Sequence, residues 1–382
     1  MWAIGMMSGT SLDGIDIAMI ETDGETVQSF GPVASYPYDQ EGADRPLIFG
    51  AMDDARDLTD RAARPGRLAA AEEAVTRLNR DALLRFLEGD LPARPDVVGF
   101  HGQTVVHRPQ LGLTLQLGDG AALASAAGIP VIHDLRQSDM EAGGQGAPLV
   151  PVFHRALVRA LGRSGPVVVL NLGGVANITY LDGTGDELLA CDVGPANALL
   201  DDFMLARTGQ VCDENGAAAA AGRVDEAVLA RLMSHEFFRM GPPKSLDRNE
   251  FRAFAADVAP WQTIALEDGA ATMSAFTAAG VASVVPYLPK TPDSWIVCGG
   301  GAHNATLIRM LRERLAPARV ETGAEIGWSV DHIEAQAFAF LAVRSLRGLP
   351  LSFPGTTGVP RPQTGGVLAS PGPDLPRKAA VA

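Results

Sequence analysis

The fold is decided by a stretch near the N-terminus that reads Gly5-Met6-Met7-Ser8-Gly9-Thr10-Ser11-Leu12-Asp13-Gly14-Ile15-Asp16. Apolar runs flank its polar centre, Trp2–Met7 before it and Ile15–Ile20 after it, and Asp23-Gly24 then supplies a hairpin signal. The pattern predicts a strand, a tight polar turn and a second strand. A unit of the same form recurs about 165 residues later, at Val167–Tyr180, again followed by an Asp-Gly pair. This echo indicates two halves of similar design, although the low identity between the units leaves a duplication open.

Length, composition and charge narrow the class of protein. The chain has 382 residues, of which 47% are hydrophobic, which suits two domains with substantial cores. A net charge of −14 without a basic run argues against nucleic acid or an anionic membrane as the main partner. No apolar run approaches the roughly 18 residues of a membrane span, and no secretory signal is visible. Three cysteines make no disulfide framework and no zinc pair. We therefore expect a soluble, cytoplasmic protein.

The remaining pattern predicts an α/β fold. Helical spacing covers Arg67–Leu87 and a helix-like run covers Pro148–Leu161. Short apolar runs predict further strands at Val97–Phe100, Leu113–Leu117, Val131–Ile132 and Val167–Leu172. Strands that alternate with helices favour a mixed α/β sheet. The Pro-rich tail 370–382 is predicted to be disordered.

Four glycine-rich junctions are candidate ligand sites. The Ser8–Ser11 turn and the Asn171–Gly174 turn offer closely spaced backbone N–H groups, which can cradle phosphate. Gly143–Pro148 precedes a helix, an arrangement that points N–H groups at an anion, and Cys298–Asn304 permits a flat nucleobase to lie against the backbone. Each junction taken alone is equally compatible with an ordinary turn or connector. The first lacks the lysine of a Walker loop.

Carboxylates supply the acid–base candidates, which are Asp134, Asp139, Asp192 and Glu334. Asp192 directly follows an apolar strand and precedes a Gly-Pro turn, where a carboxylate can enter a cleft or simply form the turn. Glu334 lies in an apolar helical stretch, so it needs a partner or an exposed face. The seven histidines have no metal-ligand spacing, and no Gly-x-Ser-x-Gly elbow supports a serine hydrolase.

Taken together, these segments resemble the anhydro-N-acetylmuramic acid kinases of the sugar kinase/Hsp70/actin superfamily. The resemblance spans the chain to about Gly366. It is carried by the first glycine-rich stretch and by segments at 101–109, 115–118, 134–139, 143–151, 171–177, 192–197, 243–245, 298–304, 334–339 and 354–358.

The resemblance implies an ATP-dependent enzyme of peptidoglycan recycling. Such enzymes convert 1,6-anhydro-N-acetylmuramic acid, ATP and water into N-acetylmuramic acid 6-phosphate and ADP. It also implies two ribonuclease-H-like (actin-like ATPase) domains with a nucleotide cleft between them, Mg²⁺ and a homodimer. We expect domain I to comprise 1–135 and 337–369, including a returning C-terminal helix, and domain II to comprise 136–336.

The same resemblance and the residue chemistry assign the sites. Asp192 is the expected general base, and Asp13 and Asp16 are expected to hold Mg²⁺ through water. The expected ATP-binding residues are Gly9, Thr10, Ser11, Leu12, Asp13, Gly14, Ile15, Asp16, Asn171, Gly173, Gly174, Gly299, Gly300, Gly301 and Asn304. The expected sugar-binding residues are His101, Gln103, Thr104, Arg136, Gln145, Gly146 and Glu334.

Three positions depart from the family pattern. Ala196 replaces a usual glycine, which is harmless if its φ is negative; Leu135 replaces an aromatic residue and Ser138 a basic one. The missing charge at Ser138 leaves open a kinase for a different anhydro sugar. A hexose kinase and a non-catalytic, actin-like ATP-binding module are further alternatives, because a fold does not determine function.

Overall fold

The computed structural model describes residues 1–372 except 10, 40, 184–186, 247 and 260, and it describes the backbone but not the side chains of 248–250. Most of the tail predicted to be disordered, namely 373–382, lies outside this part. The chain divides into two compact units: unit 1 is Met1–Ala160 with Glu334–Ala382, and unit 2 is Leu161–Ile333.

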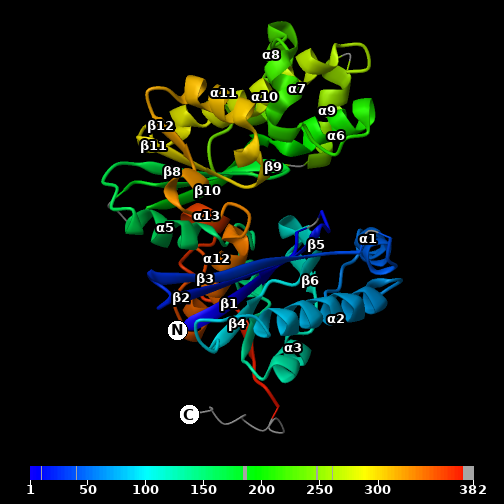
Figure 1. Cartoon of the computed structure of the whole chain (residues 1–382), viewed down its shortest axis with the longest axis vertical. Coiled ribbons are helices and arrows are strands. Elements are labelled where there is room, and N and C mark those ends of the chain that lie inside the picture. The colour runs from blue at the N-terminus through cyan, green and yellow to red at the C-terminus, as the bar shows by residue number, and fades with distance from the viewer. Residues whose placement is uncertain (10, 40, 184–186, 247, 260, 373–382) are drawn as a thin grey trace. The chain divides into compact units, whose positions relative to one another are not determined.

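Unit 1 is built on a six-stranded mixed sheet with the order β13-β7-β4-β1-β2-β3 (Figure 1). The strands are β1 (Trp2–Met7), β2 (Gly14–Thr22), β3 (Val27–Pro37), β4 (Val97–Phe100), β7 (Val131–His133) and β13 (Val367–Ala369). β2 is antiparallel to β1 and β3, whereas β4 is parallel to β1 and β7. The predicted strand–turn–strand unit and its following hairpin are therefore confirmed.

Two glycines let a helix contact the backbone of this sheet. Gly5 of β1 and Gly99 of β4 are register partners. A Cβ at Gly5 would lie 1.8 Å from the carbonyl oxygen of Ala335, and one at Gly99 would lie 2.0 Å from that of Phe338. Both carbonyls belong to α12 (Ile333–Leu346), so α12 packs directly on β1 and β4. This contact places Glu334, in the first turn of α12, above the end of the sheet.

The other face of the sheet is covered by α2 (Leu68–Leu87), the helix that the periodicity predicts from Arg67 (Figure 1). Ile4 and Met6 of β1 share one buried cluster with Ala71 and Val75 of α2. The alternation along β1 thus sends large side chains toward α2 and small ones toward α12.

Unit 1 contains further helices and a small hairpin. They are α1 (Asp44–Asp54), β5 (Gln103–Arg108), η1 (Pro109–Leu111), β6 (Leu113–Leu117), α3 (Gly120–Ala127), α4 (Gln137–Glu141), α5 (Pro151–Ala160) and α13 (Pro354–Thr357). β5 and β6 form an antiparallel pair outside the large sheet.

Unit 2 repeats the topology of unit 1 in a five-stranded sheet with the order β10-β9-β8-β11-β12. The strands are β8 (Val167–Leu172), β9 (Val175–Leu181), β10 (Leu188–Pro195), β11 (Ser294–Cys298) and β12 (Arg319–Thr322). β8, β9, β10, β11 and β12 take the places of β1, β2, β3, β4 and β7, with the same pairing directions. The predicted fold class, α/β with two domains of similar design, is confirmed.

The helices of unit 2 bury one core. They are α6 (Asn197–Thr208), α7 (Ala217–Ala221), α8 (Glu226–Leu232), α9 (Arg248–Val258), α10 (Leu266–Ser283) and α11 (Ala305–Leu315), with short turns η2 (Glu214–Gly216), η3 (Glu236–Arg239), η4 (Val285–Tyr287), η5 (Gly300–His303) and η6 (Ala324–Ile326). The segment Leu266–Tyr287 is long and apolar enough to cross a membrane, but 78% of its apolar window is buried inside the protein. It is therefore a core helix.

The boundary between the units differs from the expected domain boundary. Residues 136–160 belong to unit 1 rather than to domain II, because their side chains contact unit 1. Arg136 is bonded to His101, and the Phe153 ring of α5 lies 5.4 Å from that of Phe340 in α12. The returning helix joins unit 1 from Glu334, slightly before the expected residue 337.

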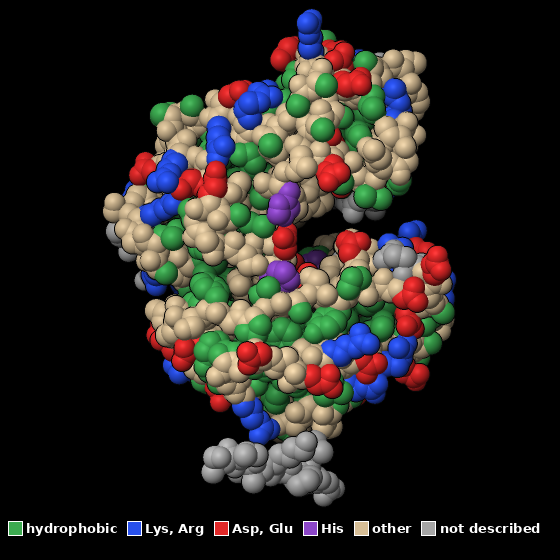
Figure 2. Space-filling view, viewed as in Figure 1, with side chains coloured by type: hydrophobic (Ala, Val, Ile, Leu, Met, Phe, Trp, Pro, Cys, Tyr) green, Lys and Arg blue, Asp and Glu red, His purple; other side chains and the backbone are tan. Residues whose placement is uncertain are grey.

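Charge is spread over both units. On the face shown in Figure 2, Lys and Arg side chains are interspersed with Asp and Glu. On that face the acidic side chains are therefore not gathered in one patch.

Candidate active site

The first glycine-rich turn is held in shape by residues that point inward. Leu12 is fully buried and adopts a positive φ of 54°, and its N–H donates to the Gly9 carbonyl at 3.3 Å. Ser11 and Asp13 remain exposed at the tip, while Thr10 lies outside the described residues. The turn can therefore present backbone N–H groups and a hydroxyl to an anion.

Three of the predicted ATP-binding residues in this turn have no side chain that faces a ligand. Two of the side chains are buried, and the third residue is a glycine with no space for a side chain. Leu12 and Ile15 are buried, so only their backbone can meet a ligand. A Cβ at Gly14 would lie 2.7 Å from the Tyr36 carbonyl oxygen, which makes Gly14 a packing glycine between β2 and β3.

Gln103 fastens this turn to the start of β5. Its Oε1 accepts from the Ser8 hydroxyl at 3.0 Å, and its Nε2 donates to the Gly9 carbonyl at 3.2 Å. The Gln103 side chain is fully buried. The neighbouring Thr104 hydroxyl accepts from Gln116 at 3.3 Å. Gln103 is a predicted sugar-binding residue, but its side-chain amide is hydrogen-bonded to the first glycine-rich turn.

Arg136 is the centre of a buried polar cluster in unit 1. Its guanidinium donates to Nε2 of His101 at 2.9 Å and to the Gly146 carbonyl at 2.9 Å. Because arginine only donates, Nε2 of His101 accepts, and its proton sits on Nδ1. Burial and the charge of Arg136 hold the pKa of His101 well below its usual value, so the imidazole is neutral.

Glu334 lies within the electrostatic field of Arg136. Burial raises the pKa of Glu334, the positive charge of Arg136 opposes that rise, and the Asp16 carboxylate adds to it. Burial also lowers the pKa of Arg136 to about 10, with Glu334 and Asp139 opposing the shift. The structure thus brings together Arg136, His101, Gly146, Glu334 and Asp16 from five separate segments.

Asp139, an acid–base candidate from the sequence, has a structural role instead. Its carboxylate accepts from the Gly146 N–H at 2.6 Å, from the Thr357 hydroxyl at 2.7 Å and from the Ser352 hydroxyl. The Gln145 N–H donates to the Thr357 carbonyl at 2.8 Å. All three bonds lie within unit 1, so the carboxylate of Asp139 is engaged by structural donors. It ties the loop at 143–146 to the segment around α13.

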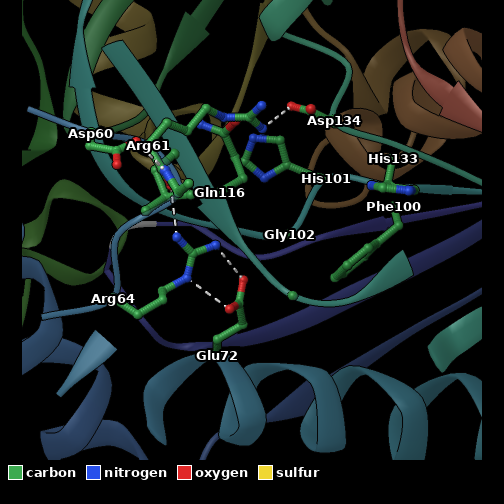
Figure 3. A pocket seen from close by; sticks show the side chains of 13 residues that line it. Asp60, Arg61, Arg64, Glu72, Phe100, His101, Gly102, Gln116, His133 and Asp134 are labelled. Atoms are coloured by element: carbon green, nitrogen blue, oxygen red, sulfur yellow. Dashed lines mark hydrogen bonds and ion pairs between the residues drawn. The ribbon is translucent and has the colours of Figure 1, made fainter. Parts of the chain in front are cut away.

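Asp134 is engaged at the edge of a pocket of about 410 Å³ (Figure 3). Its carboxylate pairs with Arg61 at 2.6 Å, and Arg64 pairs with Glu72 at 2.8 Å beside it. His101 and Gln116 line the same pocket. Asp134, an acid–base candidate from the sequence, is therefore engaged in an ion pair with Arg61.

In unit 2 the second turn and the third glycine cluster pack against each other. Gly299 has a φ of 77°, and a Cβ there would lie 2.4 Å from Oδ1 of Asn171. A Cβ at Gly301 would lie 2.6 Å from Cβ of Leu172. The carbonyls of Gly173 and Gly174 accept from the N–H groups of Asn197 and Ala196. The predicted ATP-binding residues Gly299–Gly301 therefore pack against the turn that contains Asn171, Gly173 and Gly174, and Gly301 itself is buried.

Two details of this surface settle questions left by the sequence. Ala196 has a φ of −121°, so alanine is accommodated where the family usually has glycine. Asn304 caps α11, its side-chain oxygen accepting from the Leu307 N–H at 2.9 Å. Asn304, predicted as an ATP-binding residue, thus uses its side-chain oxygen at the helix terminus.

Asp192 occupies a half-buried position on β10, beside a register shift between Asp192 and Gly194. Its Oδ2 accepts from the Leu246 N–H at 2.8 Å, and its own N–H donates to the Lys244 carbonyl at 3.0 Å. Burial raises the pKa of Asp192 to about 6, while the Leu246 N–H and the Lys244 charge oppose the rise. A carboxylate with this pKa is a suitable general base near neutral pH. Lys244 is absent from the predicted site residues, although the segment 243–245 is one of those that carry the family resemblance.

A magnesium site with water-mediated ligands fits the first turn. Asp13 is exposed there, and Asp16 accepts from the Ser35 hydroxyl at 2.5 Å. Within the described part of the chain, no group of three or more His, Cys, Asp or Glu side chains could enclose a metal ion. Two carboxylates suit Mg²⁺ in phosphoryl-transfer sites, where water and phosphate complete the coordination.

Comparisons with known proteins assign the family. The sequence profile of the anhydro-N-acetylmuramic acid kinases matches residues 1–371. The anhydro-N-acetylmuramic acid kinase of Azorhizobium caulinodans is 58% identical over 375 residues, covering 98% of this chain and 100% of that protein. That of Bradyrhizobium diazoefficiens is 56% identical over 372 residues, covering 97% and 99%.

Solved structures give more distant likenesses. The activator of the 2-hydroxyisocaproyl-CoA dehydratase from Clostridium difficile, with bound ADPNP, aligns with a TM-score of 0.43 and 14% identity over 91% of this chain and 96% of that one. A ROK family glucokinase from Streptomyces griseus aligns with a TM-score of 0.36 and 14% identity, covering 90% and 99%. The family assignment rests on the sequence matches.

Proposed function

Because the chain belongs to the anhydro-N-acetylmuramic acid kinase family, we propose that Asp192 is the general base of its reaction. The chain is an ATP-dependent phosphotransferase, which opens the 1,6-anhydro ring of 1,6-anhydro-N-acetylmuramic acid and phosphorylates O6. The products are N-acetylmuramic acid 6-phosphate and ADP. The observation that carries the proposal is the oriented, half-buried Asp192 carboxylate with its pKa raised to about 6.

The chemistry requires one base and no protein acid. O6 is bridged to C1 and carries no proton, so it becomes a nucleophile only as the C1–O6 bond breaks. Water attacks C1, Asp192 takes the proton of that water, and the electron pair of the C1–O6 bond passes to O6. O6 then bonds to the γ-phosphorus of ATP while the bond to the ADP oxygen breaks. Phosphorus takes the place that a proton takes in a glycosidase.

The two glycine-rich turns are the proposed ATP phosphate sites, with Gly9 and Ser11 in unit 1 and Asn171–Gly174 in unit 2. The Gly299–Gly301 surface is the proposed adenosine site. Asp13 and Asp16 would hold Mg²⁺ through water, and the ion would neutralise charge on the phosphate oxygens. The hairpin geometry and the tight contact between Gly299 and Asn171 support these roles.

The Arg136 cluster is the proposed sugar site. Arg136 supplies positive charge for the anionic lactyl group, and its hydrogen bonds hold His101 and Gly146 in place. Glu334 offers an acceptor to sugar hydroxyl or amide groups beside it. Gln145 and Thr104 lie on the flanking loop and strand, so we include them as contacts.

The decisive experiment combines Asp192→Asn with solvent ¹⁸O. For the wild type, we expect sugar-dependent ADP release and one ¹⁸O at C1 of the product. For Asp192→Asn, we expect kcat to fall by roughly 10²–10⁴-fold, because a general base contributes about that factor, while calorimetry still shows ATP binding. A variant that keeps near wild-type turnover would contradict the base assignment.

Three further properties are proposed from the family. We expect a cytoplasmic enzyme, a homodimer, and catalysis that uses residues from both units. Light scattering on the purified protein tests the dimer directly.

A further inference from the structure

A short segment after η3 brackets the proposed base. The Lys244 carbonyl accepts from the Asp192 N–H at 3.0 Å, and the Leu246 N–H donates to Oδ2 of Asp192 at 2.8 Å. One bond fixes the backbone of β10 and the other fixes the carboxylate itself. The segment therefore determines which oxygen of Asp192 remains directed away from the protein backbone.

The side chain of Lys244 turns inward. The residue is only 6% exposed, its Nζ donates to the Phe237 carbonyl at 3.0 Å, and Nζ lies 4.2 Å from the centre of the Phe237 ring. A buried ammonium costs free energy unless other groups compensate for its lost hydration. The chain has 31 Lys and Arg residues, and it uses arginine at most basic positions. A compact lysine charge at a buried position is therefore a specific choice.

Lys244 is the charged side chain that acts on Asp192 among the described residues. Its charge lowers the pKa of Asp192, whereas burial raises that pKa. Burial raises the pKa of the adjacent Cys191 thiol to about 12, so this group is neutral at physiological pH. The residue opposite Asp192 on β9 is Asn177, which does not titrate.

Among the residues whose side chains the structure describes, those of η3 that are buried against β10 are apolar. η3 contributes the apolar Phe237 and Phe238, and its charged residues Glu236 and Arg239 are exposed. The Phe238 ring lies against Gly194, with Gly280 of α10 beside it. At the Asp192 carboxylate, burial is therefore opposed by the Leu246 N–H and by the charge of Lys244.

We propose that Lys244–Leu246 is the positioning segment of the Asp192 base: the Leu246 N–H orients the carboxylate, and the Lys244 ammonium keeps it ionised at neutral pH. The inference rests on the proposed function, since it assumes that Asp192 is the base. Lys244 acts through Asp192 and is a positioning residue rather than a catalytic one.

The test compares pH profiles of kcat/KM for the sugar. Removing the charge with Lys244→Met raises the pKa of Asp192, so the midpoint of the acid limb moves to higher pH by about one unit or more. Lys244→Gln keeps a donor for the Phe237 carbonyl without the charge, and we expect the same upward shift. Lys244→Arg retains the charge and should keep the wild-type midpoint. Lys290→Met removes an exposed lysine from the same unit and should leave the midpoint unchanged.

A ¹³C NMR titration of the aspartate carboxyls gives an activity-independent readout. The Asp192 signal is the one missing in Asp192→Asn, and its midpoint should rise in both charge-removing variants. The inference would be overturned if the Asp192 midpoint were unchanged in Lys244→Met and Lys244→Gln. It would also be overturned if the only effect of these two variants were a rise in KM for ATP. Retained turnover in Asp192→Asn would instead sink the base assignment, so the two failures are distinguishable.

Discussion

At the scale of single residues, hydrogen-bond partners separate four carboxylates that look alike in sequence. Asp134 pairs with an arginine, Asp139 accepts from three donors, and Glu334 faces Arg136. Asp192 has one backbone N–H and a raised pKa. Because a pKa near 6 suits a general base near neutral pH, Asp192 is the proposed base among the four.

The first prediction at this scale concerns pH. Asp192 acts as a carboxylate, and burial raises its pKa to about 6. The specificity constant kcat/KM should therefore be constant above that pH. Below it, kcat/KM should fall about tenfold per pH unit, because the carboxylate is protonated. Stopped assays of ADP release between pH 4.5 and 8 measure the limb. A flat profile through pH 5, with the protein still folded by circular dichroism, contradicts the assignment.

At the scale of elements, two close contacts position the site in unit 1. α12 lies on the backbone of β1 and β4 because Gly5 and Gly99 have no side chain. Asp139 joins α4, the loop at 143–146 and the segment of α13 through hydrogen bonds. The first contact sets the height of Glu334 above the sheet, and the second sets the position of Gly146 and, through it, Arg136.

Gly99→Ala tests the helix contact. A methyl group would lie 2.0 Å from the Phe338 carbonyl oxygen, so the helix or the strand must move. We expect a loss of about 1–3 kcal/mol or more in the free energy of unfolding, measured by urea titration. Gly372→Ala, where nothing lies within 4 Å, is the matched control and should be silent.

Thr357→Val tests the Asp139 contact. The change keeps the shape of the side chain but removes one hydroxyl donor from the Asp139 carboxylate. We expect KM for the sugar to rise several-fold, with KM for ATP nearly unchanged, because the loop at 143–146 loses one anchor. Thr364→Val, at an exposed threonine of the same region, is the control. Equal effects on both substrates would show that the contact stabilises the fold without positioning the sugar site.

At the scale of the whole molecule, one strand topology occurs twice, each time with a glycine-rich turn between its first two strands. The proposed sugar and magnesium residues Arg136, Asp13 and Asp16 belong to unit 1, and the proposed base Asp192 and adenosine residues Gly299–Gly301 belong to unit 2. Binding of ATP should stabilise the folded chain by mass action.

A thermal-shift experiment measures this stabilisation. A non-hydrolysable ATP analogue at 100 times its Kd should stabilise the protein by about 2.7 kcal/mol through mass action. Omitting Mg²⁺, or replacing Asp13 and Asp16 with asparagine, should reduce the shift in Tm. Equal shifts with and without Mg²⁺ in the wild type would argue against the proposed metal role of these carboxylates.

Much of the architecture can be predicted from the sequence. The strands at Trp2–Met7, Val97–Phe100 and Val167–Leu172 and the helix at Leu68–Leu87 follow from local apolar periodicity. The repeat of the two turns predicted two similar halves. These features are local, since backbone geometry and side-chain alternation act over a few residues.

Features that depend on partners far apart in the chain could not be predicted from the sequence. The sequence could not show that the Asp139 carboxylate accepts hydrogen bonds from Ser352 and Thr357, or that Gln103 holds the first turn. The partners lie far away in the chain. The same limit explains why the boundary of unit 1 after Ala160 differs from the expected domain boundary after residue 135.

By itself, the sequence determined the family, the α/β class and the set of glycine-rich turns and carboxylates. These depend on short motifs, on apolar periodicity and on the order of both along the chain. Only the tertiary structure decided that burial raises the pKa of Asp192 to about 6, and that Asp134 and Asp139 are engaged by an arginine and by hydrogen-bond donors. Proton affinity depends on burial and on neighbouring charges such as Lys244, and folding alone brings those groups together.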